Sequence, residues 1–315
     1  MSDYMRERGR LWAVGGLWAG VLLTAFNLYA AVTTYFPQYR VRNDFRLIYG
    51  AALDGWRYVA TPFLAMPFDM ALVLWTLLLF GAAFLAWRLV APSGSLGRAA
   101  HLALFLGLFP TAFGLMVGQP VALVAAAVAI AWWLAEHRRP VLAGLALSLI
   151  AVKPQLALLV PLCLLAAGHY RVFAACAAAT AVMVVVALVL LGGDGLQRYR
   201  EVLSLASGWE PTRRYAIDGP LGLGPQVYAA QAVVVVVTLV AAWRHGHTGV
   251  ARPIAIGIVG SLLFTPYVGF QDFAMLVVAG WLVIRSGATP VQAGIMVAGY
   301  ALLELALVVL AVPIR

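Results

Sequence analysis

Apolar segments of helical length recur along almost the whole chain and are separated by short polar turns. Hydrophobic residues make up 64% of the sequence and charged residues 10%, far fewer charges than a soluble domain carries. We therefore predict an all-α polytopic membrane protein with about eleven transmembrane helices, some of them short or broken around an external cavity. The expected organisation is a single transmembrane domain over residues 1–315. The predicted spans are residues 11–35, 67–90, 99–117, 120–135, 141–152, 154–167, 171–191, 225–243, 252–267, 270–285 and 290–311.

The arginines predict the orientation of these spans. With the N-terminus in the cytoplasm, the short loops on that side are basic, as the positive-inside rule expects. The opposite face then has two longer loops, at about 36–66 and 192–224. These longer loops also contain arginines. The positive-inside rule counts the charges of short loops, so the prediction depends on the difference in loop length. The short basic loops contain Arg88, Arg98, Arg138, Arg139, Arg171, Arg244, Arg252 and Arg285.

Lys153 is the only lysine in the chain, and it lies in an apolar run, residues 145–160. A charge at the centre of a bilayer costs about 2.5–3.5 kcal/mol or more. One interpretation is a lysine at a helix end that extends its ammonium group to the membrane surface. The other is a lysine that faces a polar cavity. Pro154 prevents a regular helix at this point and Gln155 adds a second polar group, so the cavity is favoured.

Three further polar residues fall on the same predicted external side as Lys153. Asp44 lies in the first external loop among Arg42 and Arg46, and nearby cations favour an ionised carboxylate. It is a candidate general base, although the residues alone favour a solvated loop acid in a salt bridge. Gln119 occupies a Gly-Gln-Pro turn and could donate to a sugar hydroxyl or a phosphate. Asp272 either caps a helix or joins Asp44 and Lys153 at a site.

Two further features lie outside this group: a segment of the second external loop, and one acidic residue near the C-terminus. Residues 196–205, in the second external loop, place apolar side chains on one helical face and charged ones off it, which predicts a short amphipathic helix on the membrane surface. Its arginines would suit lipid phosphates, but a simple interfacial anchor is also possible. Glu304, in the last predicted span, has no obvious partner.

Several function classes lose support. Walker A, dinucleotide-binding, His-Glu-x-x-His and Gly-x-Ser-x-Gly patterns do not occur in the sequence, which argues against ATPases, dehydrogenases and the corresponding hydrolases. Cys163 and Cys176 both fall in apolar spans, so neither a disulfide framework nor a metal site is predicted. The basic residues are scattered between spans, so the net charge of +9 does not indicate nucleic-acid binding.

The order of short motifs over about residues 40–285 resembles glycosyltransferase family 87, whose members belong to the GT-C class of polytopic enzymes. No single motif is specific, but the order and spacing together are. The motifs are Asn43-Asp44-Phe45, Tyr49, Pro67, Leu74-Trp75, Gly118-Gln119, Arg139-Pro140, Ala143-Gly144-Leu145, Lys153-Pro154-Gln155, Thr265-Pro266-Tyr267 and Asp272.

The resemblance implies a GT-C-like fold and transfer of a sugar, a hexose or pentose with mannose favoured, from a polyprenyl-phosphate donor to a hydroxyl of a lipid or glycan acceptor. It implies a catalytic acid in the first external loop, which is Asp44 here. The donor phosphate would bind Lys153, Arg42 and Arg46. The cavity would be lined by Gln119, Gln155, Tyr267 and Asp272.

The expected location is the bacterial plasma membrane, with the N-terminus in the cytoplasm and the active site on the periplasmic or extracellular face. The scheme requires no cofactor and no tightly held metal, and its partners are membrane lipids, the donor and the acceptor. Two other hypotheses stay open. A non-catalytic assembly partner is favoured by a short first loop that has no Tyr-Pro-Pro element between Tyr58 and Phe68. A lipid or solute transporter would show inverted repeats, which we do not see.

Overall fold

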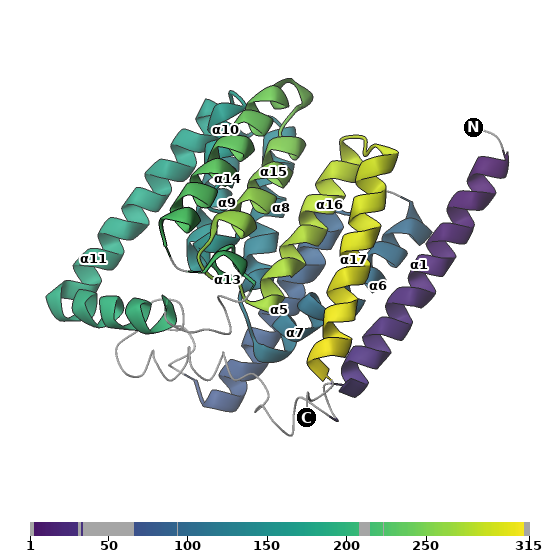
Figure 1. Ribbon diagram of the computed structural model, residues 1–315, viewed down its shortest axis with the longest axis horizontal. Helices are drawn as coiled ribbons and strands as arrows, with labels where there is room; N and C mark the ends of the chain where they lie inside the picture. The colour runs from purple at the N-terminus through teal and green to yellow at the C-terminus, as the bar shows by residue number, and fades with distance from the viewer. Residues whose placement is uncertain are drawn as a thin grey trace.

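The computed structural model describes residues 3–30, 33, 66–92, 94–207, 215–222 and 224–311. Over these residues the regular structure is entirely helical, so the all-α prediction is confirmed. The helices lie side by side, with α1 and α11 at opposite edges (Figure 1). They are α1 Asp3–Ala30, α5 Phe68–Val90, α6 Ser95–Gly107, α7 Phe109–Val117, α8 Val121–Glu136, α9 Pro140–Ser148, η2 Leu149–Val152, η3 Pro154–Leu156, α10 Val160–Ala166, α11 Tyr170–Ser207, α13 Asp218–Leu221, α14 Pro225–Arg244, η4 Gly246–Thr248, α15 Ala251–Phe264, η5 Phe270–Ala274, α16 Met275–Arg285 and α17 Pro290–Ala311.

The expected count of about eleven transmembrane helices is not confirmed. In the described part of the chain, four helices are long and apolar enough to cross a membrane, or five if the bent pair α6 and α7 forms one span. Three other apolar helical stretches, Val121–Glu136, Pro140–Val152 and Ala251–Phe264, are shorter than a bilayer crossing requires. The four long spans are Gly9–Ala30, Phe68–Val90, Tyr170–Glu201 and Pro225–Arg244.

The predicted helix over 99–117 is two helices, α6 and α7, bent by 61°. Pro110 lies in the first turn of α7, where its ring is tolerated but prevents a continuous helix. Two distant side chains bind the backbone exposed at the bend: Asn27 Nδ2 donates to the Gly107 carbonyl (2.6 Å), and the Phe109 amide donates to Glu304 Oε1 (2.7 Å). Glu304, for which the sequence showed no obvious partner, therefore binds a backbone amide at the bend.

The core is built around α8, which packs against α5 and α9. Most of its side chains are buried alanines and valines, and such small residues let helices approach closely in a membrane. Gly144 extends this packing to α11, because a Cβ there would lie 2.4 Å from the Val172 carbonyl oxygen. The outer helices expose large hydrophobic side chains, as a lipid-facing surface requires.

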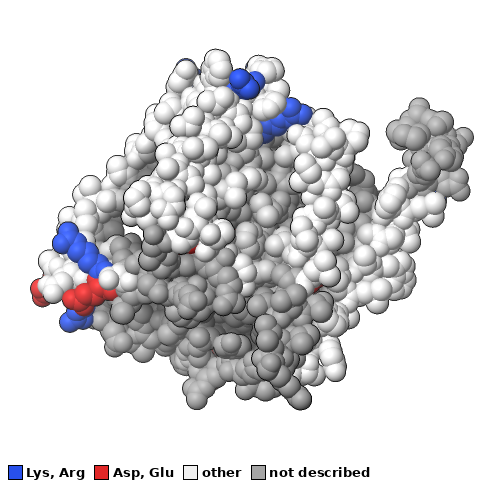
Figure 2. All heavy atoms as spheres, viewed as in Figure 1, with Lys and Arg blue, Asp and Glu red and all other residues white. Residues whose placement is uncertain are grey.

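Two arginines from the predicted cytoplasmic loops cap helix ends. Arg285 donates to the carbonyls of Val90 (2.6 Å) and Ala91 (2.9 Å) at the end of α5 and lies 5.0 Å from the Trp132 ring centroid. Arg252 donates to carbonyls just after α16. A cation at a helix C-terminus is stabilising. In Figure 2, basic side chains lie at the upper end of the molecule, while both signs of charge cover the second half of α11 at lower left.

We expect Arg285→Met to lower the free energy of unfolding by about 1.5–3 kcal/mol, because hydrogen bonds to a charged group are lost and carbonyls at the end of α5 lose their partner. Thermal unfolding in detergent measures this change. The matched control is Arg88→Met, at an exposed arginine in the last turn of α5, which should unfold at nearly the parental temperature. Equal effects of the two substitutions would show that the Arg285 contacts contribute nothing specific.

The helix α11 changes direction at Gly192, whose φ of 62° and ψ of −170° are not helical. Glycine adopts such a backbone without steric cost. The part of α11 after Gly192 runs across the end of the molecule and does not continue in the direction of the first part (Figure 1). Residues 196–205 are thus helical, as predicted, and Arg198, Arg200 and Glu201 are exposed on this segment. That the segment lies on a membrane surface stays a prediction.

Candidate functional site

Lys153 forms a buried ion pair with Asp272. Its Nζ donates to Asp272 Oδ1 and, at 2.9 Å, to Gln119 Oε1. The side chain of Lys153 is 11% exposed and that of Asp272 is 1% exposed. A lysine extended to the membrane surface would be exposed, so the structure supports the interpretation in which Lys153 faces a polar interior.

An interruption of the helix positions Lys153. The residue stands between two short 3-10 segments, η2 and η3, with φ −150° and ψ 75°. Pro154 opens η3 and cannot continue the hydrogen bonding of the preceding helix. The chain nearby is held by the Leu159 amide, which donates to Ser261 Oγ (2.8 Å). Irregular backbone of this kind is tolerated at membrane depth where it is enclosed by protein or lines a cavity.

Asp272 performs both roles that the sequence left open. One carboxylate oxygen binds Lys153, and the other accepts the Gly269 amide (3.0 Å), which caps η5. Paired and capped in this way, the carboxylate is fixed in position. A buried charge without such partners would be strongly unfavourable.

The turn that presents Gln119 is fixed by a buried tryptophan. Gly118 has a left-handed conformation with φ 81°, which glycine adopts readily, and its carbonyl accepts Trp75 Nε1 (2.8 Å). Trp75 is 2% exposed. In the sequence, Trp75 stood out only as part of the Leu74-Trp75 motif, and nothing in the pattern around it indicated a partner 43 positions away.

Gln155 and Tyr267 form a second polar pair beside the first. Gln155 Nε2 donates to the Tyr267 hydroxyl oxygen (3.0 Å). Tyr267 lies in the turn between α15 and η5, outside the helical spans. Burial raises the pKa of its phenol, and electrostatic interactions with Asp272 and Tyr199 raise this pKa further. The phenol therefore keeps its proton at neutral pH and can donate it. Its electrostatic interaction with Tyr267 shows that Tyr199, on the second half of α11, also lies near the site. The sequence did not predict this.

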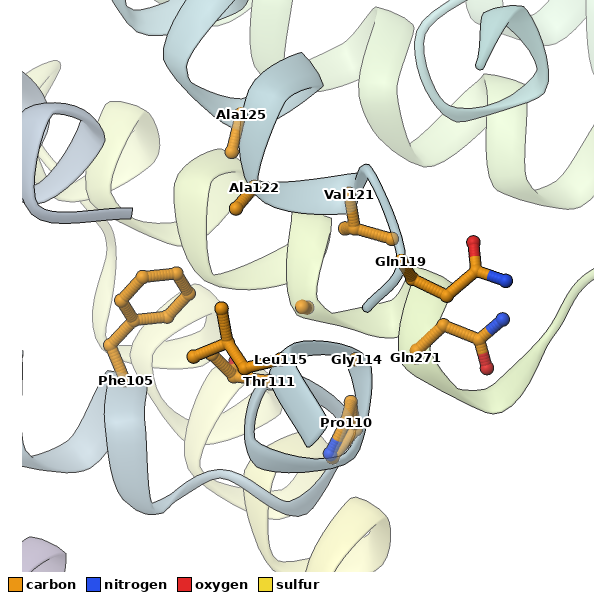
Figure 3. A pocket seen from close by; sticks show the side chains of 11 residues that line it. Phe105, Pro110, Thr111, Gly114, Leu115, Gln119, Val121, Ala122, Ala125 and Gln271 are labelled. Carbon is orange, nitrogen blue, oxygen red and sulfur yellow. The ribbon is translucent and has the colours of Figure 1, made fainter. Parts of the chain in front are cut away.

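A recess adjoins this cluster between α7, α8 and η5 (Figure 3). Apolar side chains such as Phe105 and Ala122 form one side. The side chains of Gln119 and Gln271 lie next to each other at the other end. Gln119 therefore belongs to both the recess and the Lys153 cluster.

The structure thus brings together five residues that the sequence proposed for the site, from three separate parts of the chain. They are Gln119, Lys153, Gln155, Tyr267 and Asp272. Asp44, Arg42 and Arg46 lie outside the described residues. The ammonium group of Lys153 has three N–H donors, of which Asp272 and Gln119 take two. Among the described residues, the third donor has no partner, so Lys153 can donate one more hydrogen bond, to an anionic oxygen.

Comparison with known proteins identifies the family. The model of glycosyltransferase family 87 matches residues 55–266, about two thirds of the chain. The match includes Gln119, Lys153 and Gln155 and lies within the range of the resemblance; Asp44 and Asp272 fall outside it. The searches matched no curated protein and no solved structure. The chain belongs to glycosyltransferase family 87, and it is a membrane glycosyltransferase.

Proposed function

We propose that the protein transfers a sugar from a polyprenyl-phosphate donor to a hydroxyl of a lipid or glycan acceptor on the external face of a bacterial plasma membrane. The sugar is a hexose or pentose, with mannose favoured. One observation carries this proposal: the only lysine of a family 87 chain is buried in a cluster whose described residues leave one of its N–H donors for an anion. Such a donor set suits a phosphate.

In the proposed reaction, the acceptor oxygen attacks the anomeric carbon of the donor sugar. The acceptor hydroxyl gives its proton to Asp44, and the bond between the anomeric carbon and the phosphate oxygen breaks. The polyprenyl phosphate leaves with that electron pair and gains negative charge. Lys153 stabilises this charge, together with Arg42 and Arg46 from the first external loop.

Asp272 and Gln119 orient the ammonium group in this scheme. An ion pair fixed in place keeps the lysine charged inside a low-dielectric region, where an isolated charge is costly. A preorganised donor of this kind stabilises developing charge without rearranging during the reaction. The two partners thus act as positioning residues for Lys153.

A transfer assay with purified protein tests the proposed function. Short-chain polyprenyl phosphates that carry labelled mannose, glucose or arabinofuranose are incubated with a membrane lipid extract as acceptor. We expect one of these donors to release polyprenyl phosphate and give a glycosylated product in equal amounts. Donor binding without turnover would favour the assembly partner. Movement of intact donor across a vesicle membrane would favour the transporter.

Tyr267 should contribute to donor binding. Its phenol accepts from Gln155 and keeps its own proton to donate to a phosphate oxygen. We expect Tyr267→Phe to weaken binding of a short-chain polyprenyl phosphate about tenfold, which corresponds to one hydrogen bond to a charged group. Tyr228→Phe is the control, because Tyr228 on α14 is 75% exposed. Parental affinity in both variants would exclude Tyr267 as a donor contact.

A further inference from the structure

The recess beside the Lys153 cluster contains a threonine hydroxyl that no residue of the described chain binds. Thr111 lines the recess and is 5% exposed. Its Oγ1 is buried and has no hydrogen-bond partner within the described residues. Buried polar groups nearly always have partners, so this hydroxyl calls for an explanation.

Other threonines show what is different at Thr111. Thr24 and Thr76 each donate to the carbonyl four residues earlier, at 2.7 and 2.6 Å, which is the usual arrangement in helices. For Thr111 that carbonyl belongs to Gly107, which lies beyond the bend between α6 and α7 and accepts from Asn27. The bend has therefore taken away the normal acceptor, and the hydroxyl is left on the wall of the recess.

The rest of the lining is uncharged and of two kinds. Phe105 and Ala122 present carbon atoms, whereas Gln119 and Gln271 present amides that lie side by side at one end (Figure 3). Gly114 lets η5 approach, because a Cβ there would lie 3.2 Å from Gln271 Cβ. A wall that combines carbon surface with neutral donors and acceptors matches a sugar, whose ring presents C–H groups and hydroxyls at the same edge.

We infer that the recess binds one hydroxyl-bearing edge of a sugar, with Thr111 Oγ1 bonded to a sugar hydroxyl and the amides of Gln119 and Gln271 at its entrance. The inference rests on the proposed function. Gln119 connects the two sites, since its side chain lines the recess and accepts from Lys153 (2.9 Å). A phosphate at Lys153 therefore places the sugar that it carries next to the recess, which makes the donor sugar the occupant.

The test compares two ligands that differ only in the sugar. Binding of a short-chain polyprenyl-phosphomannose and of the same polyprenyl phosphate without sugar is measured for the parent and for Thr111→Val. We expect the variant to lose about five- to tenfold in affinity for the sugar-bearing ligand, the effect of one hydrogen bond. Its affinity for the bare phosphate should stay parental. Its melting temperature should stay the same or rise, because an unpaired buried hydroxyl is removed.

Thr76→Val is the matched control, because its hydroxyl bonds within its own helix, and both affinities should stay parental. If Thr111→Val keeps the donor affinity but raises the acceptor KM, the recess binds the acceptor, and the inference that the donor sugar occupies it is overturned. Two other results of Thr111→Val overturn the inference: an equal loss of affinity for both ligands, or no change in either affinity or in the acceptor KM. So does a parent that binds mannose, glucose and arabinofuranose donors no better than bare phosphate. If the parent does not bind even polyprenyl phosphate, the proposed donor is wrong and the inference fails with it.

Discussion

Replacing Asp44 with asparagine should lower sugar transfer by about 10²–10⁴-fold, the usual cost of losing a general base. The amide keeps the shape of the side chain but cannot take the acceptor proton. Donor binding and the melting temperature should stay parental, because Asp44 itself has no proposed contact with the donor phosphate. The measurement is the initial rate of transfer from a labelled polyprenyl-phosphate sugar at saturating donor.

Asp54→Asn is the control for this experiment, since Asp54 falls in the same predicted external loop and has no proposed catalytic role. It should react at the parental rate. Transfer at the parental rate by Asp44→Asn would remove Asp44 from the reaction. The base would then have to be sought among the other acids on the external face.

Replacing Lys153 with methionine should destabilise the protein by about 3–5 kcal/mol, because the buried carboxylate of Asp272 loses its partner. The sequence alone left open whether Lys153 extends to the membrane surface or faces a polar cavity. The buried ion pair with Asp272 is the reason to expect a loss of stability. Thermal or denaturant unfolding in detergent measures the loss, and donor affinity should fall at the same time.

A double variant separates the two roles of Lys153. Lys153→Met combined with Asp272→Asn removes both charges and leaves the amide oxygen to accept from Gly269. We expect stability to return to within about 1–2 kcal/mol of the parent, since the stranded charge is gone. Donor affinity should remain low. A double variant that regains donor affinity would show that Lys153 acts only through stability.

The local breaks in the site could be predicted from the sequence. Pro154 and the Gly118-Gln119 pair indicate interrupted helices without any tertiary information. A charge in an apolar run also predicts a buried partner or a polar cavity. Placing Lys153 and Asp272 on one face therefore needed only the predicted topology, and the ion pair agrees with it.

The partners of side chains on distant segments could not be predicted. Glu304 binds an amide 195 positions away, and Trp75 binds the carbonyl of the turn before Gln119. In both cases the acceptor or donor is a backbone group, which every residue possesses, so the sequence contains no signal for the pairing. Pro110 is a signal for the bend between α6 and α7. We nevertheless predicted one continuous span over 99–117, because the apolar run continues through this proline.

The most direct test of the account is a structure with a short-chain polyprenyl phosphate bound. We predict that the phosphate lies within hydrogen-bonding distance of Lys153 Nζ, with Gln119 and Asp272 still in contact with the lysine and Asp44 on the same face of the membrane. A phosphate bound away from Lys153, or Asp44 on the opposite face, would contradict the proposed donor site.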